Sequence, residues 1–190
     1  MGTMRTANYK LAATPYVGIT EDAGPNNDSK GRITAMLKAV GCPPGSSWCA
    51  AFVSQVFRDC GSNAFPMSGS SQAIKREFDK KALLSEEPND LLKWSGAVAG
   101  WTDENDSMHG HVFLVTERFT DVNGNLTGIG TIEGNTGASG QANGDGCYHK
   151  RRNLYSDGKF YPVDGSGAKT GPGHFIWFCD TSHLTGGSIW

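Results

Sequence analysis

A helix that crosses a membrane needs at least about 18 consecutive apolar residues, and an export signal needs a shorter apolar core behind positive charges. The sequence has neither, because no apolar run of that length occurs and residues 1–10 contain no apolar core. We therefore expect no membrane span, no membrane partner and no signal peptide, and we expect synthesis in the cytoplasm.

An excess of charge of one sign is also lacking. Lys and Arg number 17 and Asp and Glu number 19, which leaves a formal net charge of −2. Nucleic acids and anionic lipids are bound through a strongly positive surface, which this composition does not supply. The balance of charge therefore argues against a nucleic-acid partner.

Cysteines are few, and their number is odd. Five cysteines in a chain of 190 residues do not form the paired framework of a small disulfide-rich protein. We expect reduced thiols, one of which is a candidate for catalysis. Cys42 and Cys60 flank an expected helix and would pair in an oxidising setting, and the spacing alone leaves that alternative open.

The periodicity of apolar residues predicts helices first and strands afterwards, which is the order of an α+β protein. We expect N-terminal helices packed on a C-terminal antiparallel β-sheet, in a single domain over residues 15–190 that follows a loosely ordered leader over residues 1–14. The expected helices cover about residues 30–40, 48–60 and 72–81, and the expected strands cover 97–101, 111–118, 126–133, 147–152 and 175–178.

Cys49 is the clearest candidate nucleophile. Apolar residues follow it at the i, i+3, i+4 and i+7 spacing of a helix with one buried face. Ser46 or Ser47 is expected to cap the start of this helix, and Gly61 its end. In the first turn, free backbone N–H groups and the helix dipole favour a thiolate over a thiol. The alternative interpretation is a buried structural cysteine.

A cysteine nucleophile needs a histidine to carry its proton and a third group to orient the imidazole. His111 is the candidate because it begins an apolar strand beside Gly110. The turn Asp121–Gly124 predicts a three-residue hairpin loop, and this register places Glu133 and Asn135 on the sheet face of the histidine. Cross-strand geometry sets Asn135 opposite His111, whereas charge favours Glu133 as the orienting group, because a carboxylate stabilises the imidazolium.

Together these motifs, in this order and at these separations, resemble the CHAP family of cysteine, histidine-dependent amidohydrolases and peptidases. The matching segments are Trp48-Cys49-Ala50-Ala51-Phe52-Val53, Gly110-His111-Val112 and Ile132-Glu133-Gly134-Asn135-Thr136, with Gly18-Ile19-Thr20-Glu21 and Asn26-Asn27 upstream. The resemblance covers about residues 16–180 and implies a papain-like fold. The chain departs from the family before the histidine: in place of the usual Gly-Asp pair leading into an apolar strand it has Ser95-Gly96-Ala97-Val98-Ala99-Gly100-Trp101, and a polar insertion over residues 102–109 follows. It also lacks the acids before the cysteine through which some phage members bind calcium.

The resemblance implies a peptidoglycan hydrolase, either an amidase or an endopeptidase, that cleaves an amide bond of the stem peptide or cross-bridge. It implies Cys49 as nucleophile, His111 as general base, Glu133 as the group that orients the histidine, and Asn135 as a fourth, supporting site residue.

We further expect Trp48, Gly110 and Trp101 to contact the substrate, and we expect neither a cofactor nor a metal. Peptidoglycan is the expected partner of a monomeric enzyme, together with an immunity protein if the enzyme is a secreted effector. A one-domain wall hydrolase without a signal peptide reaches the cell wall through a phage membrane lesion or through a secretion machine.

Three alternatives stay open. The pairs His109-x-His111 and Cys147-x-His149 have a spacing that could present metal ligands from neighbouring strands. A non-catalytic wall-binding or interaction module could use the same fold. Other enzymes of this layout are NlpC-type peptidases, transglutaminase-like enzymes and amide hydrolases of small metabolites, although the Glu-x-Asn arrangement favours the CHAP resemblance.

Overall fold

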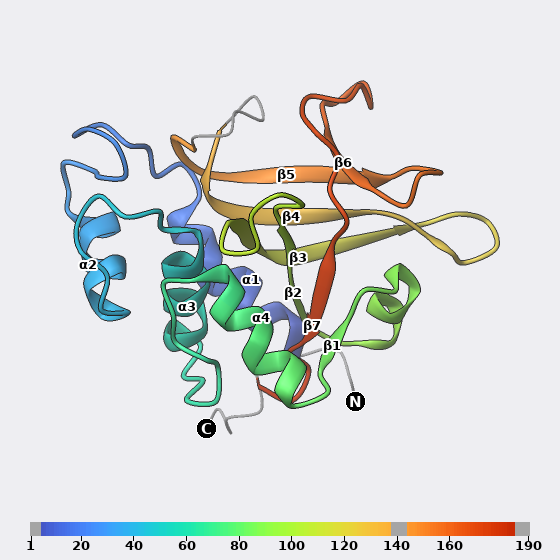
Figure 1. Ribbon diagram of the computed structural model, residues 1–190, viewed down its shortest axis with the longest axis horizontal. Helices are drawn as coiled ribbons and strands as arrows, with labels where there is room; N and C mark the ends of the chain where they lie inside the picture. Colours follow the sequence, from blue (N-terminus) through green and yellow to red (C-terminus); the bar gives the residue numbers. More distant parts are fainter. Residues whose placement is uncertain (1–4, 138–143, 185–190) are drawn as a thin grey trace.

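The computed structural model describes residues 5–137 and 144–184, which form an α+β fold with helices grouped beside a curled antiparallel sheet (Figure 1). The helical segments are α1 (Arg5–Ala13), η1 (Thr14–Tyr16), α2 (Arg32–Ala39), α3 (Cys49–Asp59), α4 (Ser71–Lys80) and η2 (Pro88–Lys93). The strands are β1 (Leu84–Ser85), β2 (Ala97–Thr102), β3 (Gly110–Thr120), β4 (Leu126–Thr136), β5 (Gly146–Leu154), β6 (Phe160–Val163) and β7 (Trp177–Asp180). Their order in the sheet is β1-β7-β2-β3-β4-β5-β6, and all neighbours are antiparallel. The general α+β expectation is confirmed.

Two apolar cores lie on opposite faces of the sheet. In the first, Phe52 and Phe57 of α3 share a cluster with Val112 and Leu114 of β3. In the second, Phe113 of β3 packs with apolar residues of β2, β4, β6, β7 and η2. Because successive side chains of a strand point to opposite faces, His111, two positions before Phe113, lies on the face of the second core.

The N-terminal segment differs from the expected loose leader. Residues Arg5–Ala13 form α1, in which Tyr9 is fully buried. The Tyr9 hydroxyl donates to the carbonyl of Val115 at 2.5 Å, and its ring centroid lies 5.9 Å from that of Phe57. A helix of nine residues gains little from its own propensity and is stabilised by tertiary packing, which local sequence does not reveal. The expectation for residues 1–14 is therefore wrong where α1 forms.

The three expected helices are present as α2, α3 and α4, with one difference in capping. Ser70 caps α4, its hydroxyl accepting a backbone N–H of the first turn at 3.2 Å. Neither serine before α3 caps that helix: Trp48 holds the N-cap position without a side-chain hydrogen bond, and the Ser46 hydroxyl donates to the Pro43 carbonyl at 2.8 Å. Gly61 ends the helix region with a φ of 72°, the left-handed conformation that glycine favours.

The hairpin between β3 and β4 has the predicted loop. The N–H of Gly124 donates to the carbonyl of Asp121 at 3.1 Å, and the N–H of Asp121 donates to the carbonyl of Asn125 at 2.9 Å. Two irregularities in the ladder shift the register and then restore it, so that Leu114 pairs with Ile132 as the loop predicts. The hairpin prediction is therefore confirmed at the end of the ladder that leads to the candidate site.

Longer-range features were not expected from the sequence. The short strands β1 and β6 form the two edges of the sheet, and β7 lies between β1 and β2 although it is last in the chain.

All five cysteines are free, so Cys42 and Cys60 are not joined. Over the described ranges, no helix combines the length and apolar character needed to cross a bilayer.

Candidate active site

Cys49 is the first residue of α3 and is buried, with 6% of its surface exposed. Burial by itself raises the pKa of a thiol. The hydrogen bond and positive charge of His111 outweigh burial, and backbone N–H groups of Val112 and Ala50 act in the same direction. The pKa of Cys49 is therefore lowered, as a thiolate nucleophile requires.

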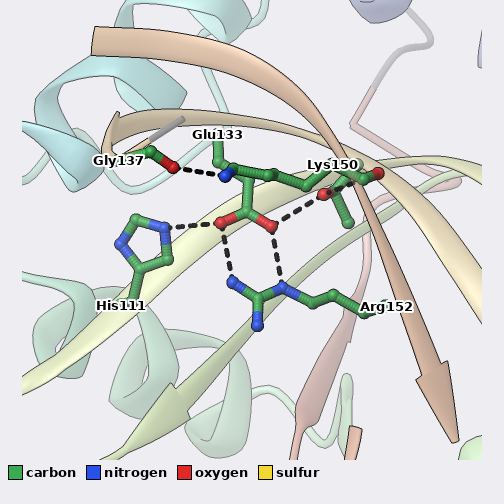
Figure 2. Close-up of polar contacts among 6 residues, drawn as sticks. His111, Glu133, Gly137, Lys150 and Arg152 are labelled. Atoms are coloured by element: carbon green, nitrogen blue, oxygen red, sulfur yellow. Dashed lines mark hydrogen bonds and ion pairs between the residues drawn. The ribbon is translucent and has the colours of Figure 1, made fainter. Parts of the chain in front are cut away.

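His111 lies between the thiol and a carboxylate. Its Nε2–H donates to Oε2 of Glu133 at 3.0 Å, which leaves Nδ1 for the hydrogen bond with Cys49 (Figure 2). Burial lowers the pKa of an imidazole, but the hydrogen bonds to Cys49 and Glu133 and the negative charges of both groups raise it to about 9. The imidazole is therefore protonated at neutral pH, opposite a thiolate.

Glu133 is a fully buried carboxylate whose charge is compensated on all sides. Nε of Arg152 donates to its Oε1 and Nη2 to its Oε2, both at 2.8 Å, and the Thr131 hydroxyl donates to Oε1 at 2.7 Å. Burial raises the pKa of Glu133, but the charge of Arg152 and the hydrogen bonds hold it far below its usual range. The carboxylate is therefore ionised and held in one orientation toward the histidine.

Arg152 and Thr131 were missed by the sequence reasoning. Arg152 comes from β5 and is 6% exposed, and its guanidinium faces Glu133 (Figure 2). The guanidinium carbon also lies 4.9 Å from the centre of the Phe113 ring. An arginine at an inward position of a strand requires a buried partner, and that requirement is the signal that could have pointed to Glu133.

Asn135 lies near His111 but does not orient it. The nitrogen of His111 that faces β4 donates to Glu133, so the expectation from charge is met and the one from direct cross-strand opposition is not. Asn135 sits at a register shift between Gly134 and Thr136 with a φ of 56°, a conformation that asparagine tolerates better than most residues. It lines a cavity together with His111.

The three expected substrate contacts differ in position. Trp48 is fully buried and its indole N–H donates to Glu21 at 2.9 Å, so its side chain is part of the core and the expectation is wrong. At Gly110, a Cβ would lie 2.2 Å from the carbonyl oxygen of Trp101 and 2.3 Å from Nε2 of Gln72. The atoms that approach Gly110 closely therefore belong to the protein itself. Trp101 lines the cavity beside the histidine, where a substrate contact is feasible.

Three hollows among the described residues are of a size to hold a ligand. One, of about 290 Å³, is bordered by His111, Asn135 and Trp101. The other two, of about 540 Å³ and about 390 Å³, have none of the catalytic candidates in their lining. Of the three, the hollow of about 290 Å³ is the one that adjoins the reactive groups.

The pairs His109-x-His111 and Cys147-x-His149 do not converge on a metal site. Cys147 belongs to the core on the helix side of the sheet, whereas His111 lies on the opposite face with Glu133. The ring of His109 is exposed and bonds to Asp106 at 2.6 Å. Within residues 5–137 and 144–184, no three His, Cys, Asp or Glu side chains are arranged to hold a metal ion. The described residues therefore give the metal alternative no support.

Comparison with known proteins adds no family. No family model matches the sequence, and no curated protein matches it. The functional argument therefore rests on the residues of this chain and their geometry.

Proposed function

We propose that this protein is a CHAP-type, papain-like cysteine hydrolase that cleaves an amide bond of peptidoglycan, acting as an amidase or endopeptidase. The single observation that carries the proposal is the continuous contact from Cys49 through His111 to Glu133. A binding module has no need of a thiol with a lowered pKa beside a protonated histidine. Such a pair has an obvious use in acyl transfer.

The reaction follows from the protonation states. The Cys49 thiolate attacks the carbonyl carbon of the amide, and a thioester forms as the C–N bond breaks. The His111 imidazolium gives its proton to the leaving nitrogen, so that an amine departs. The neutral imidazole then takes a proton from water as the oxygen of that water attacks the thioester; the acid is released, and the Cys49 thiolate and the His111 imidazolium are restored. Glu133 stabilises the imidazolium whenever it is present.

Arg152 keeps the Glu133 carboxylate ionised throughout the proposed reaction. Because the carboxylate already has a bidentate cationic partner, it is ionised before the reaction and needs no reorganisation when the histidine is charged. Asn135, on the cavity side of His111, is proposed as the supporting group that contacts substrate or the oxyanion.

Peptidoglycan as substrate is supported by the ordered motifs around Cys49, His111 and Glu133 that resemble CHAP enzymes. We propose delivery to the wall through a phage membrane lesion or a secretion machine, with synthesis in the cytoplasm.

Digestion of purified sacculi tests the proposal. Wild-type protein should release muropeptides whose new ends, read by mass spectrometry, identify the cleaved bond, and Cys49→Ala should release none while keeping its circular dichroism spectrum. Cys60→Ala, at the other end of the same helix, is the matched control and should retain activity. Full activity in folded Cys49→Ala would overturn the proposal. Inactivity of the wild type on sacculi from several species, with turnover of small amides, would favour the metabolite hydrolase instead.

A further inference from the structure

The helix that begins with the candidate nucleophile has no side-chain cap at its start. Trp48 holds the N-cap position of α3 without a side-chain cap hydrogen bond, and its carbonyl accepts the N–H of Phe52 at 2.8 Å. The first turn of an uncapped helix is the part that frays most readily. Cys49 is the first residue of that turn, so its distance from His111 depends on what else holds Trp48 in place.

Glu21 holds Trp48 through its side chain. Oε1 of Glu21 accepts the indole N–H of Trp48 at 2.9 Å, and Oε2 accepts the backbone N–H of Asn26 at 2.7 Å. The Trp48 side chain is fully buried, so its N–H needs an acceptor within the protein. Without the carboxylate, the indole would have to move to find another partner, and the start of α3 would move with it.

The backbone of Glu21 is itself fixed to the sheet. Its N–H donates to the carbonyl of Asp145 at 2.7 Å. The N–H of Gly18 donates to the carbonyl of Cys147 at 2.8 Å, and the N–H of Cys147 donates to the carbonyl of Ile19 at 2.9 Å. The segment before Glu21 therefore lies along the start of β5, and the Glu21 side chain reaches from the sheet to α3.

Trp48 also contacts β4 beside the orienting carboxylate. A Cβ at Gly134 would lie 2.7 Å from Cζ3 of the Trp48 ring. Gly134 directly follows Glu133, whose carboxylate accepts the N–H of His111. The helix half of the site and the sheet half therefore meet at Trp48, and the indole hydrogen bond to Glu21 fixes this residue.

We propose that Glu21 is a positioning residue of the candidate active site, which fixes the start of α3 through Trp48 at the separation where the Cys49 thiol meets His111. The inference rests on the proposed function, because it takes Cys49 and His111 as the reacting pair. Glu21 acts on this pair through Trp48 and takes no part in the chemical steps.

The pH midpoint of Cys49 alkylation measures this separation without turnover. The alkylation rate follows the thiolate fraction, so its midpoint reports the pKa of the thiol, whereas access to the thiol changes only the plateau. Glu21→Ala should raise the midpoint by about one pH unit, because a thiol farther from His111 loses the cation that favours the thiolate. Loss of the Glu21 charge alone acts in the opposite direction, since removing a negative charge lowers the pKa of a thiol. An unchanged or lower midpoint in folded Glu21→Ala would overturn the proposal.

Two further substitutions separate position from charge. Trp48→Phe removes the indole N–H, keeps an aromatic ring and leaves every charge in place, so it should raise the midpoint as Glu21→Ala does. The double variant should raise it no further, because both substitutions break the same contact. Glu21→Gln keeps a carbonyl acceptor for the indole, and its midpoint should lie at or below that of the wild type. A midpoint raised as far in Glu21→Gln as in Glu21→Ala would contradict the indole hydrogen bond as the route.

Asp22→Ala is the matched control from the same segment. The Asp22 carboxylate also accepts two hydrogen bonds, from the backbone N–H of Ser29 at 2.5 Å and from the Ser29 hydroxyl at 2.8 Å, and neither leads to α3. Asp22→Ala should therefore leave the midpoint in place. A rise equal to that of Glu21→Ala would assign the effect to loosening of the segment and overturn the positioning role. Circular dichroism checks that each variant is folded.

The positioning role and the proposed reaction can fail separately. His111→Ala should raise the same midpoint, and an unchanged midpoint there would overturn Cys49 and His111 as the reacting pair. A rise in His111→Ala without one in Glu21→Ala overturns the positioning role alone. A rise in both variants supports the positioning role even if wild-type protein digests no sacculus, in which case the proposed substrate is the part that is wrong.

Discussion

The sulfur atoms of the five cysteines are in different electrostatic surroundings. Burial and the charge of Asp59 raise the pKa of Cys60 to about 11, and burial with the charge of Glu133 raises that of Cys147 to about 12. Burial also raises the pKa of Cys179. At Cys49, in contrast to Cys60, Cys147 and Cys179, a neighbouring cation reverses the effect of burial on the pKa. Thiol reactivity is therefore expected to separate Cys49 from the other thiols whose pKa is raised.

Alkylation should report this difference directly. At pH 7, iodoacetamide should modify Cys49 faster than the other four cysteines, because the rate follows the thiolate fraction. Peptide mapping after short exposure measures the order of labelling. His111→Ala removes the cation and should slow labelling of Cys49 by about tenfold or more, since its pKa then rises. Faster labelling of the partly exposed Cys42 than of Cys49 would contradict the assignment.

The pH dependence of hydrolysis tests the division of roles between Glu133 and Asn135. The active form carries an imidazolium, so the rate should fall as pH rises through the His111 pKa of about 9. Glu133→Gln removes a negative charge that raises this pKa, so the basic limb should move to lower pH and the rate should fall by about 100-fold or more. Asn135→Ala should leave the limb in place and cost less.

A substitution of Arg152 tests the same pH dependence, and it is not expected to move the basic limb to lower pH as Glu133→Gln does. Arg152→Gln removes the cation that offsets the Glu133 charge, so the basic limb should stay or move to higher pH while the maximal rate falls. Both single variants leave a buried charge without its partner, so folding is checked by circular dichroism before rates are compared. A basic limb that shifts in Asn135→Ala and not in Glu133→Gln would reverse the two roles.

Among the elements, the β3–β4 hairpin was predictable and the β4–β5 pairing was not. The turn at Asp121–Gly124 specifies its loop by local chemistry, and loop length fixes which residues share a face. The join between β4 and β5 contains several turn signals, Asn143-Gly144 and Asp145-Gly146 among them, so local sequence does not select one register, and the register that brings Arg152 near Glu133 depends on tertiary packing. The placement of Glu133 beside His111 could therefore be predicted from local sequence, whereas the pairing of Arg152 with Glu133 could not.

Contact between α3 and β4 depends on Gly134. A Cβ there would lie 2.7 Å from the Trp48 ring and 2.8 Å from Phe52, both in the rigid core. Gly134→Ala should therefore force β4 away from α3 and destabilise the protein by about 1–3 kcal/mol, measured by urea unfolding. It should also slow hydrolysis, because Glu133 is the adjacent residue.

Gly124 offers a control for the Gly134 substitution. No atom lies within 4 Å of a Cβ at Gly124, although its φ is 83°. Gly124→Asn should cost less than Gly134→Ala, because asparagine tolerates this backbone and no packing is disturbed. A loss in Gly134→Ala no larger than that in Gly124→Asn would contradict the close approach of α3 as a source of destabilisation, because Gly134 has no left-handed backbone for alanine to strain.

For the molecule as a whole, the sequence predicted the division into helices and sheet but not what completes the core. Apolar periodicity is strong in α3 and in β3, each of which has a continuous buried face. Tyr9 is a fully buried aromatic residue of α1, and it contacts Val115 and Phe57. Both partners are distant in sequence, and Val115 lies 106 positions after Tyr9. Contacts at such separations are set by the fold and not by the segment itself.

Whether α1 is an integral part of the domain is decided by Tyr9. Its ring is fully buried against Phe57, and its hydroxyl satisfies a buried carbonyl on β3. Tyr9→Phe should cost about 1 kcal/mol for the lost hydrogen bond, and Tyr9→Ala about 3–5 kcal/mol for the lost ring. Urea unfolding followed by circular dichroism measures both changes. Leu11→Ala, on an exposed residue of the same helix, should be close to neutral, and a Tyr9→Ala protein as stable as the wild type would restore the loose leader.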